Sequence, residues 1–253
     1  IVGHPDVRRM LLDMRSLTEA MRGICLMNAV AMDRAGSLAD EDARQAAEDL
    51  NELLIPITKA WCTDMGVEVT SLAIQVYGGM GFVEETGVSQ FFRDARIAPI
   101  YEGTNGIQAM DLVGRKLPMR SGGVVTDTIA DIRATAAALS ADDELAGIGA
   151  RLAEAPDALD EATQWIFGHA GEIRDVLAGA TPYLRMWGLV VGGWVLGKSA
   201  LAAAEWAADD GPADFCAEKV RTARWFADQH LSTVVGLTAR ATSGASLMDE
   251  ASL

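Results

Sequence analysis

Apolar residues recur every three or four positions along most of the chain, which is the spacing of one face of an α-helix. The first such pattern begins at His4-Pro5-Asp6, where a proline and an acidic residue suit a helix N-terminus. It continues to about Arg34, and Gly36-Ser37 ends it. Its apolar members are Val7, Met10, Leu11, Met14, Leu17, Met21, Ile24 and Val30. We therefore expect a long first helix.

A second helical pattern opens at Asp40-Glu41-Asp42 and meets Pro56. Because a proline inside a helix removes a hydrogen bond and clashes with the preceding turn, we expect a break or kink there and a third helix after it. The apolar positions of that third pattern are Trp61, Met65, Val69, Leu72 and Val76. Three long antiparallel helices predict a bundle.

Shorter elements follow the bundle. A short helix is expected over 86–97, and Pro99 favours an extended backbone leading to Tyr101. Thr104 can cap the next helix, which reaches Leu117. The segment 118–124, PMRSGGV, is rich in Gly, Ser and Pro between two periodic regions and is the best boundary. The sequence thus predicts an all-α protein, with an antiparallel helical bundle over 1–118 and a second helical domain over 119–253.

The second part of the chain is also helical in pattern. Its expected helices cover about 125–139, 142–153, 157–178, 182–208 and 212–241. Turn signals separate the last four at Ala155-Pro156, Thr181-Pro182 and Gly211-Pro212. Five of the six tryptophans lie here, and we expect those on apolar faces to pack in the core or at an interface. Apolar runs such as Trp187 to Leu196 are too short and too rich in glycine to span a bilayer.

Composition narrows the classes of function. The chain has 253 residues, half of them hydrophobic, which suffices for one large domain or two modest ones. A net charge of −15 disfavours binding to nucleic acid or to an anionic membrane surface. Cys25, Cys62 and Cys216 are odd in number and far apart, so we expect reduced thiols of a cytoplasmic protein. His4, His169 and His230 are isolated, with no partner at metal-ligand spacing such as i,i+4, and no metal site is expected.

The stretch from Gln75 to Gln108, QVYGGMGFVEETGVSQFFRDARIAPIYEGTNGIQ, differs from the rest of the chain by its glycines. Gly78, Gly79 and Gly81 follow an apolar run, and the backbone there can turn sharply or approach a ligand closely. Arg93, Asp94 and Arg96 form an alternating charge cluster that is typical of a structural ion-pair network. Judged by its local sequence, Glu102 is most simply a loop carboxylate or a partner of a helix N-terminus.

The same stretch closely resembles the end of the flavin domain in acyl-CoA dehydrogenases. In that family a Gln-x-x-Gly-Gly-x-Gly turn, an Arg-Asp-Ala-Arg segment and a Tyr-Glu-Gly-Thr loop recur in this order at nearly this spacing. Three motifs in register over about thirty residues are far more specific than any one of them. The form TNGIQ followed by DLVGRKL is similar to the large bacterial branch of the family, whose chains continue into an extra helical domain. The resemblance implies the C-terminal portion of a longer enzyme.

The resemblance also implies a reaction, the 2,3-dehydrogenation of an acyl-CoA thioester with FAD as cofactor. The family residue that matches Glu102 is the base, which takes a proton from the carbon next to the thioester carbonyl while a hydride leaves the adjacent carbon. The backbone N–H of that same residue helps to bind the thioester oxygen. Gly103 would leave room for the acyl chain, and Tyr101 would line it.

Cofactor contacts are implied in the same way. The family residues that match Gln75, Gly78 and Gly79 contact the adenosine diphosphate half of a flavin bound mainly by a neighbouring subunit. Thr104 and Asn105 open a helix whose free N–H groups suit the same anion. Most of the family reads Thr-Ser-Glu where this chain has Thr-Asn-Gly, so the contact at Asn105 is implied less directly than that at Thr104.

The implied partners are an acyl-CoA substrate, an electron-transfer flavoprotein and further copies of the chain in a homodimer or homotetramer. Because the main flavin contacts would lie upstream, the 253-residue chain alone is expected to be inactive. Two alternatives remain. An acyl-CoA oxidase shares the glutamate but lets oxygen reach the reduced flavin, and a non-catalytic helical assembly module keeps the motifs only for packing. The presence of Glu102 favours an enzyme.

Overall fold

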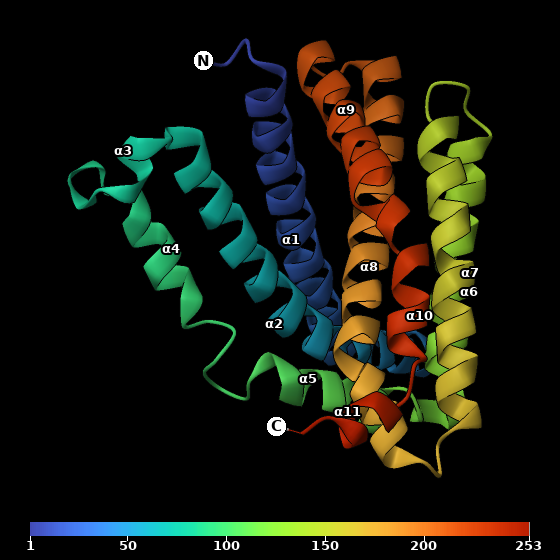
Figure 1. Ribbon diagram of the computed structural model, residues 1–253. Helices are drawn as coiled ribbons and strands as arrows, with labels where there is room; N and C mark the ends of the chain where they lie inside the picture. The colour runs from blue at the N-terminus through green and yellow to red at the C-terminus, as the bar shows by residue number, and fades with distance from the viewer. Residues whose placement is uncertain (253) are drawn as a thin grey trace.

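The computed structural model describes residues 1–252, and within this range the protein consists of helices and loops (Figure 1). Helices α1 (Pro5–Ser37) and α2 (Glu41–Tyr77) form a long antiparallel pair. Asp40 caps α2, because its carboxylate accepts a hydrogen bond from the backbone N–H of Ala43 at 2.8 Å. The predicted first helix and the start of the second are therefore confirmed.

The predicted break at Pro56 is wrong. Pro56 lies inside α2, and the expected second and third helices are one helix. A proline in a helix interior costs about 3 kcal/mol. Its neighbours Leu53, Leu54 and Ile57 are fully buried, and burial of one such side chain contributes about 1.5–3 kcal/mol. The apolar face of a continuous helix thus offsets the local cost, and the bundle here is built on two long helices rather than three.

The chain then folds back along the C-terminal half of α2 (Figure 1). The short helices α3 (Gly79–Phe82) and η1 (Glu84–Thr86) make the reversal, and α4 (Val88–Arg96) confirms the helix expected over 86–97. The extended backbone expected at Pro99 is not found. The N–H groups of Ile100 and Tyr101 both donate to the carbonyl of Ile97, at 2.9 and 3.1 Å, so turns continue the end of α4 and satisfy these groups.

The next segment leads into the second half of the chain. Helix α5 (Asn105–Asp111) continues as a π-helical segment, η2 (Leu112–Lys116), as far as Leu117, where the predicted helix was expected to end. The expected boundary is a compact turn around η3 (Met119–Gly122), with positive φ at Arg120 and Ser121. A single buried core extends across this turn. The division into two domains at 118 stays a prediction.

The second half contains four long helices followed by four short ones. The long helices are α6 (Gly123–Ser140), α7 (Ala146–Gly168), α8 (Ile173–Asp209) and α9 (Ala213–Gln229). The short ones are η4 (Leu231–Thr233), η5 (Val235–Leu237), α10 (Thr238–Ala241) and α11 (Ser246–Glu250). The expected turn at Gly211-Pro212 is confirmed.

Two other expected turns in this half are wrong. Pro156 lies inside α7 and Pro182 inside α8. The actual break between these helices falls at 169–172, within the helix expected over 157–178. The helix expected over 212–241 ends at Gln229, where the short helices begin. As at Pro56, buried apolar faces continue through both prolines.

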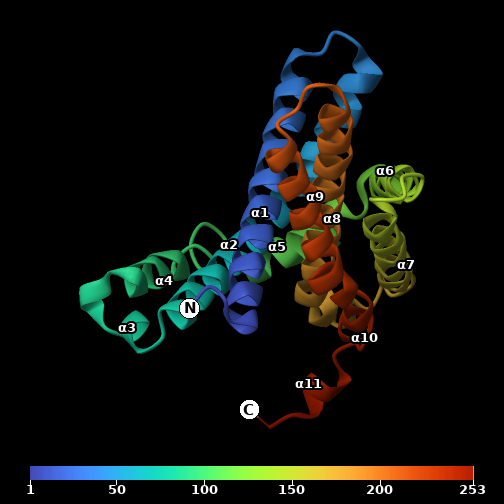
Figure 2. The same ribbon diagram turned by 90° about the horizontal axis from the view of Figure 1, so that it is seen from above.

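Helix α8 is the centre of the molecule. It packs against α1, α2, α5, α6, α7, α9 and α10, and α3–α4 and α6–α7 lie on opposite sides of this central group (Figure 2). Its tryptophans Trp187 and Trp194 are buried as expected, whereas Trp206, near its end, is 46% exposed. By length and composition α8 is apolar enough to cross a membrane, contrary to the expectation from shorter runs, but 72% of its most apolar window is buried in the protein.

Glycines let α8 approach its neighbours closely. A Cβ added at Gly188 would lie 2.1 Å from Cγ of Trp61 on α2. In the same way, a Cβ added at Gly23 of α1 would lie 2.1 Å from Cγ1 of Val195 on α8. These contacts bring the two halves of the chain together, so that residues on either side of segment 118–124 share one core.

Candidate functional site

Glu102 lies at the exposed tip of the loop that joins α4 to α5. The backbone N–H of Asn105 donates to the carbonyl of Pro99 at 3.0 Å and closes this loop. Glu102 has φ 52 and Gly103 has φ 78. A left-handed backbone costs a residue with a side chain about 1–2 kcal/mol, and such strain is concentrated at functional sites. The loop therefore holds a carboxylate in a defined and strained position facing solvent.

The groups on Glu102 are available for an external molecule. Within residues 1–252 its carboxylate forms no ion pair with a basic side chain, and its backbone N–H donates no hydrogen bond. Tyr101 beside it is 51% exposed. The loop thus presents an acceptor, a donor and an aromatic ring to the same solvent-exposed region.

Asn105 fastens the loop to α2. The Lys59 ammonium donates to Oδ1 of Asn105 at 2.8 Å, and Nδ2 of Asn105 donates to the carbonyl of Ala60 at 3.0 Å and to Asp64 Oδ1 at 2.7 Å. Both the side chain and the N–H of Asn105 are therefore engaged inside the protein. Its role in cofactor binding stays a prediction, as does that of Thr104, the N-cap of α5, which is exposed and forms no side-chain capping bond.

The three glycines after α2 lie in different surroundings. Gly81 is buried, and a Cβ there would lie 2.2 Å from the carbonyl oxygen of Ile74. Gly78 has φ 62 and ψ −144, a conformation that residues with side chains rarely adopt. Gly79 has open space at its Cβ position and, like Gly78 and the neighbouring Gln75, is exposed. Gly81 thus serves internal packing, whereas the backbone at 78–79 is open to a ligand.

The fold does not bring this glycine turn and the Glu102 loop together. They lie at opposite ends of α4, which has nine residues and is therefore about 14 Å long (Figure 1). The ion-pair network expected among Arg93, Asp94 and Arg96 on α4 is not formed within the described residues. Arg93 lies 3.5 Å from Glu84, but neither Arg93 nor Arg96 pairs with Asp94 within the part of the chain that the structure describes.

A large apolar surface accompanies both motifs, and the helical patterns did not predict it. Between Tyr77 and Met110, nine large apolar or aromatic side chains are 44% to 86% exposed. They are Tyr77, Met80, Phe82, Phe91, Ile97, Ile100, Tyr101, Ile107 and Met110. We call them the α3–α5 surface. Exposed apolar residues in such number mark an interaction surface.

Two cysteines that are far apart in the sequence are neighbours in space. The Cys62 thiol on α2 lies 3.9 Å from the carbonyl oxygen of Met21, which also accepts the helical hydrogen bond from the N–H of Cys25. A hydrogen bond from the Cys62 thiol lowers the pKa of Cys25 to about 6. The same hydrogen bond, together with burial, raises the pKa of Cys62. The sequence shows no motif that pairs them.

Two family models divide most of the chain between them. Residues 1–117 match the model described as acyl-CoA dehydrogenase, C-terminal domain, and residues 128–251 match the one described as acetyl-CoA dehydrogenase C-terminal like. A 3-methylmercaptopropionyl-CoA dehydrogenase from Ruegeria pomeroyi is 47% identical over 234 residues, which are 91% of this chain. The chain spans 40% of the length of that relative.

Solved structures show the same helical fold. An acyl-CoA dehydrogenase from Bacillus anthracis, complexed with FAD, matches 98% of this chain and 44% of its own, with a TM-score of 0.65 and 15% identity. The protein ACDH-11 of Caenorhabditis elegans, in complex with C11-CoA, matches 90% of this chain and 37% of its own, with a TM-score of 0.67 and 18% identity. Together they confirm the predicted all-α class.

Proposed function

The chain belongs to the acyl-CoA dehydrogenase family as a C-terminal portion, and on that premise we propose that it serves an FAD-dependent enzyme that dehydrogenates an acyl-CoA thioester at the 2,3 position. The observation that carries this proposal is the Glu102 loop. It is closed by a hydrogen bond, strained at Glu102, and presents a free carboxylate beside an exposed apolar surface. In the proposed reaction Glu102 is the base.

Different groups of the loop have different roles in the proposed proton removal. The Glu102 carboxylate would take the proton from the carbon next to the thioester carbonyl. A carboxylate is a weak base for this task unless the negative charge that develops on the thioester oxygen is stabilised. The free N–H of Glu102 is a donor of the kind needed there. Tyr101 and Gly103 would line the acyl chain, and closure of the site by other parts of the enzyme would exclude water.

The exposed groups of the glycine turn fit the phosphates of FAD. Gly78 and Gly79 offer an open backbone, and the side chain of Gln75 is exposed. Thr104, whose hydroxyl we also propose as a contact to FAD, is exposed at the other end of α4. Asn105 fits less well, because its amide already bonds to α2. FAD, when bound, supplies the acceptor for the hydride that leaves the substrate. An electron-transfer flavoprotein would then receive the electrons.

The separation of the two motifs supports a role for a second subunit. The glycine turn and Glu102 lie at opposite ends of α4, which supports the proposal that the turn contacts a flavin held mainly by another copy of the protein. The α3–α5 surface would be covered in that assembly. A homodimer or homotetramer with closed symmetry fits this arrangement. As a first substrate to test we propose 3-methylmercaptopropionyl-CoA, because of the 47% identity to the Ruegeria enzyme.

The test is the substitution Glu102→Gln in the full-length enzyme. Glutamine keeps the shape of the side chain but cannot take a proton. We expect normal folding and flavin content, with turnover reduced by roughly 10²–10⁴-fold, the usual loss when a positioned base is removed. Flavin bleaching by substrate without oxygen should slow equally, since proton and hydride leave in the same half-reaction.

The matched control is Glu85→Gln, which removes another exposed carboxylate close in the sequence. Its turnover should stay near wild type. Bleaching at the wild-type rate by the Glu102→Gln enzyme would show that another residue is the base. Rapid reoxidation of the reduced wild-type enzyme by oxygen would instead identify an acyl-CoA oxidase.

A further inference from the structure

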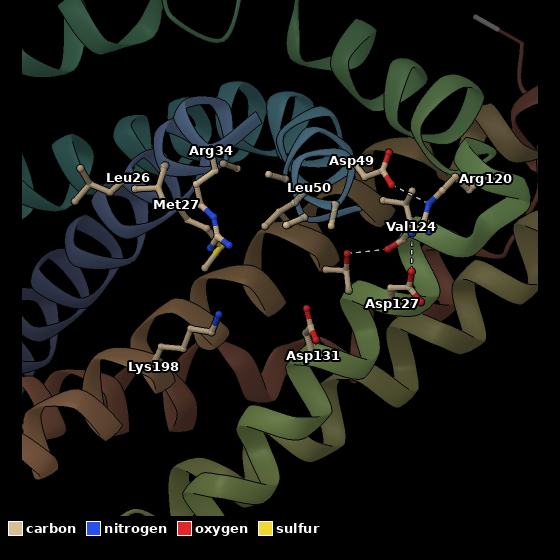
Figure 3. A pocket seen from close by; sticks show the side chains of 16 residues that line it. Leu26, Met27, Arg34, Asp49, Leu50, Arg120, Val124, Asp127, Asp131 and Lys198 are labelled. Carbon is tan, nitrogen blue, oxygen red and sulfur yellow. Dashed lines mark hydrogen bonds and ion pairs between the residues drawn. The ribbon is translucent and has the colours of Figure 1, made fainter. Parts of the chain in front are cut away.

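A cleft lies on the side of the molecule away from α3 and α4. It has a volume of about 520 Å³ and is bounded by α1, α2, α6 and α8 (Figures 2 and 3). Small-molecule sites typically have 300–1,000 Å³. Leu26, Met27, Val30 and Leu50 form an apolar wall from α1 and α2, and Val124 adds to it from α6. The cleft can therefore accept an apolar group of moderate size.

Two basic side chains in this cleft lack carboxylate partners. Figure 3 shows Arg34 of α1 and Lys198 of α8 extending toward each other across the opening. Within residues 1–252 neither forms an ion pair. Lys198 is exposed, and its ammonium lies 4.0 Å from the centre of the Trp194 ring. Two cations that face each other repel, and an anion between them would be stabilised by both.

Two of the three acidic groups in the cleft share one basic partner, Arg120, so that end keeps a net charge of about −1. Arg120 lies 2.8 Å from Asp49 and 2.5 Å from Asp127, and forms an ion-paired end (Figure 3). Asp131 is the other carboxylate of the lining, and within the described chain it has no ion pair. The two cations without ion pairs and this one carboxylate leave about +1 at the Arg34–Lys198 end, against about −1 at the Arg120 end, so the lining as a whole is neutral. A monoanion bound between Arg34 and Lys198 balances that end, whereas a dianion would exceed its charge.

The surroundings of Lys198 disfavour the charged form of its side chain. Desolvation lowers the pKa of Lys198, and the negative charge of Asp131 only partly opposes that effect. A bound carboxylate would stabilise the charged ammonium, as opposite charges at short range do. The cleft thus combines an apolar wall with an end at which Arg34 and Lys198 form no ion pair within residues 1–252.

We propose that this cleft binds an amphipathic monoanion, a carboxylate head with an unbranched apolar chain. The head lies between Arg34 and Lys198, and the chain lies along the wall of α1 and α2. The site is separate from the Glu102 loop, because α6 and α4 lie on opposite sides of the molecule (Figure 2). The ligand is not the acyl-CoA of the proposed reaction.

The test measures binding of octanoate to the full-length holoenzyme by isothermal titration calorimetry. Two comparison ligands separate the contributions of the charged head and the apolar chain to the affinity. 1-Octanol has the chain without the charge, and inorganic phosphate has charge without the chain. We expect both to bind at least about tenfold more weakly than octanoate, because a charged hydrogen bond or a buried chain is worth that much. Equal binding of 1-octanol would overturn the assignment of the charged end.

Substitutions then locate the site. Lys198→Met and Arg34→Met keep long side chains but remove the charges, and each should weaken octanoate binding by about tenfold. Arg8→Met removes an exposed cation from the same helix α1 and should have no effect. Turnover should be unchanged in all three. No octanoate binding at millimolar concentration, or binding that is insensitive to Lys198→Met and competes with the acyl-CoA, would overturn the proposal.

Discussion

The reactivity of the Cys25 thiol on α1 depends on a side chain of the neighbouring helix α2. Cys25 is exposed on α1, and its neighbour Cys62 is partly buried on α2. Donation of a hydrogen bond by one thiol stabilises the thiolate of the other, which is why the pKa of Cys25 falls while that of Cys62 rises. The thiolate is the nucleophilic form of cysteine. Cys25 should therefore be the reactive thiol of this chain.

Alkylation at varied pH tests this. With a pKa of about 6, Cys25 is mostly thiolate at pH 7, so its rate with iodoacetamide should rise as pH increases through 6 and then level off. Cys62→Ala removes the donor and should move the midpoint up toward about 8.5, the ordinary value for cysteine. Mass spectrometry of the modified peptide gives the rate, with buried Cys216 as the slow internal reference. A wild-type midpoint near the ordinary value would contradict the expectation.

The helices are stabilised more by their packing than by their local sequence. Pro56, Pro156 and Pro182 all lie inside helices, although each disfavours its own turn. Gly188 also disfavours the helix that contains it, but its missing side chain leaves the space that Trp61 fills and lets α8 pack closely on α2. The helix interfaces thus decide which local costs are tolerated.

Alanine substitutions at two helical glycines should have opposite effects on stability. Gly188→Ala places a Cβ against Trp61 and should destabilise the protein by about 1–3 kcal/mol through overpacking. Gly66→Ala, in α2, meets nothing within 4 Å and should stabilise by roughly 0.5–1 kcal/mol, because alanine favours the helix. Denaturant unfolding of the two variants measures both changes. A stable Gly188→Ala protein would show that α2 and α8 can move apart at little cost.

At the scale of the whole molecule, α3 and α4 project on one side (Figure 2), and the side chains of the α3–α5 surface and the glycine turn at 78–79 are exposed. Nothing in residues 1–252 covers them. The chain spans 40% of the Ruegeria relative, whose remaining length is available for such contacts. The proposed flavin site is therefore assembled from several parts rather than contained in this helical unit.

The 253-residue chain expressed alone should accordingly be colourless and inactive. We expect no flavin absorbance after dialysis against buffer, because the open backbone at Gly78 and Gly79 supplies only part of the contacts to FAD. The full-length enzyme treated in the same way is the control and should keep its flavin. Stoichiometric FAD in the isolated chain would mean that this unit holds the cofactor by itself.

Local patterns in the sequence were sufficient for the helical class and for the first helix, whereas the candidate site came from the family resemblance and its residue roles stay predictions. The three-residue and four-residue spacing of apolar side chains reports one buried face, which is a property of each helix alone. The motifs around Gly78 and Glu102 could be recognised in the sequence, because each is a short run of contiguous residues. The structure adds to Glu102 a positive φ and a loop closed by hydrogen bonding.

Only the tertiary structure decided which residues from different helices meet. Three findings depend on side chains far apart in the sequence. They are the continuity of α2 through Pro56, the contact of the Cys62 thiol with the carbonyl of Met21, and the hydrogen bonds from Asn105 to α2. The cleft with Arg34 and Lys198 likewise exists only where α1 and α8 come together. A helical pattern tells which face of a helix is buried, but the partner of that face is set by the packing of the whole chain, because burial is favourable against any complementary apolar surface.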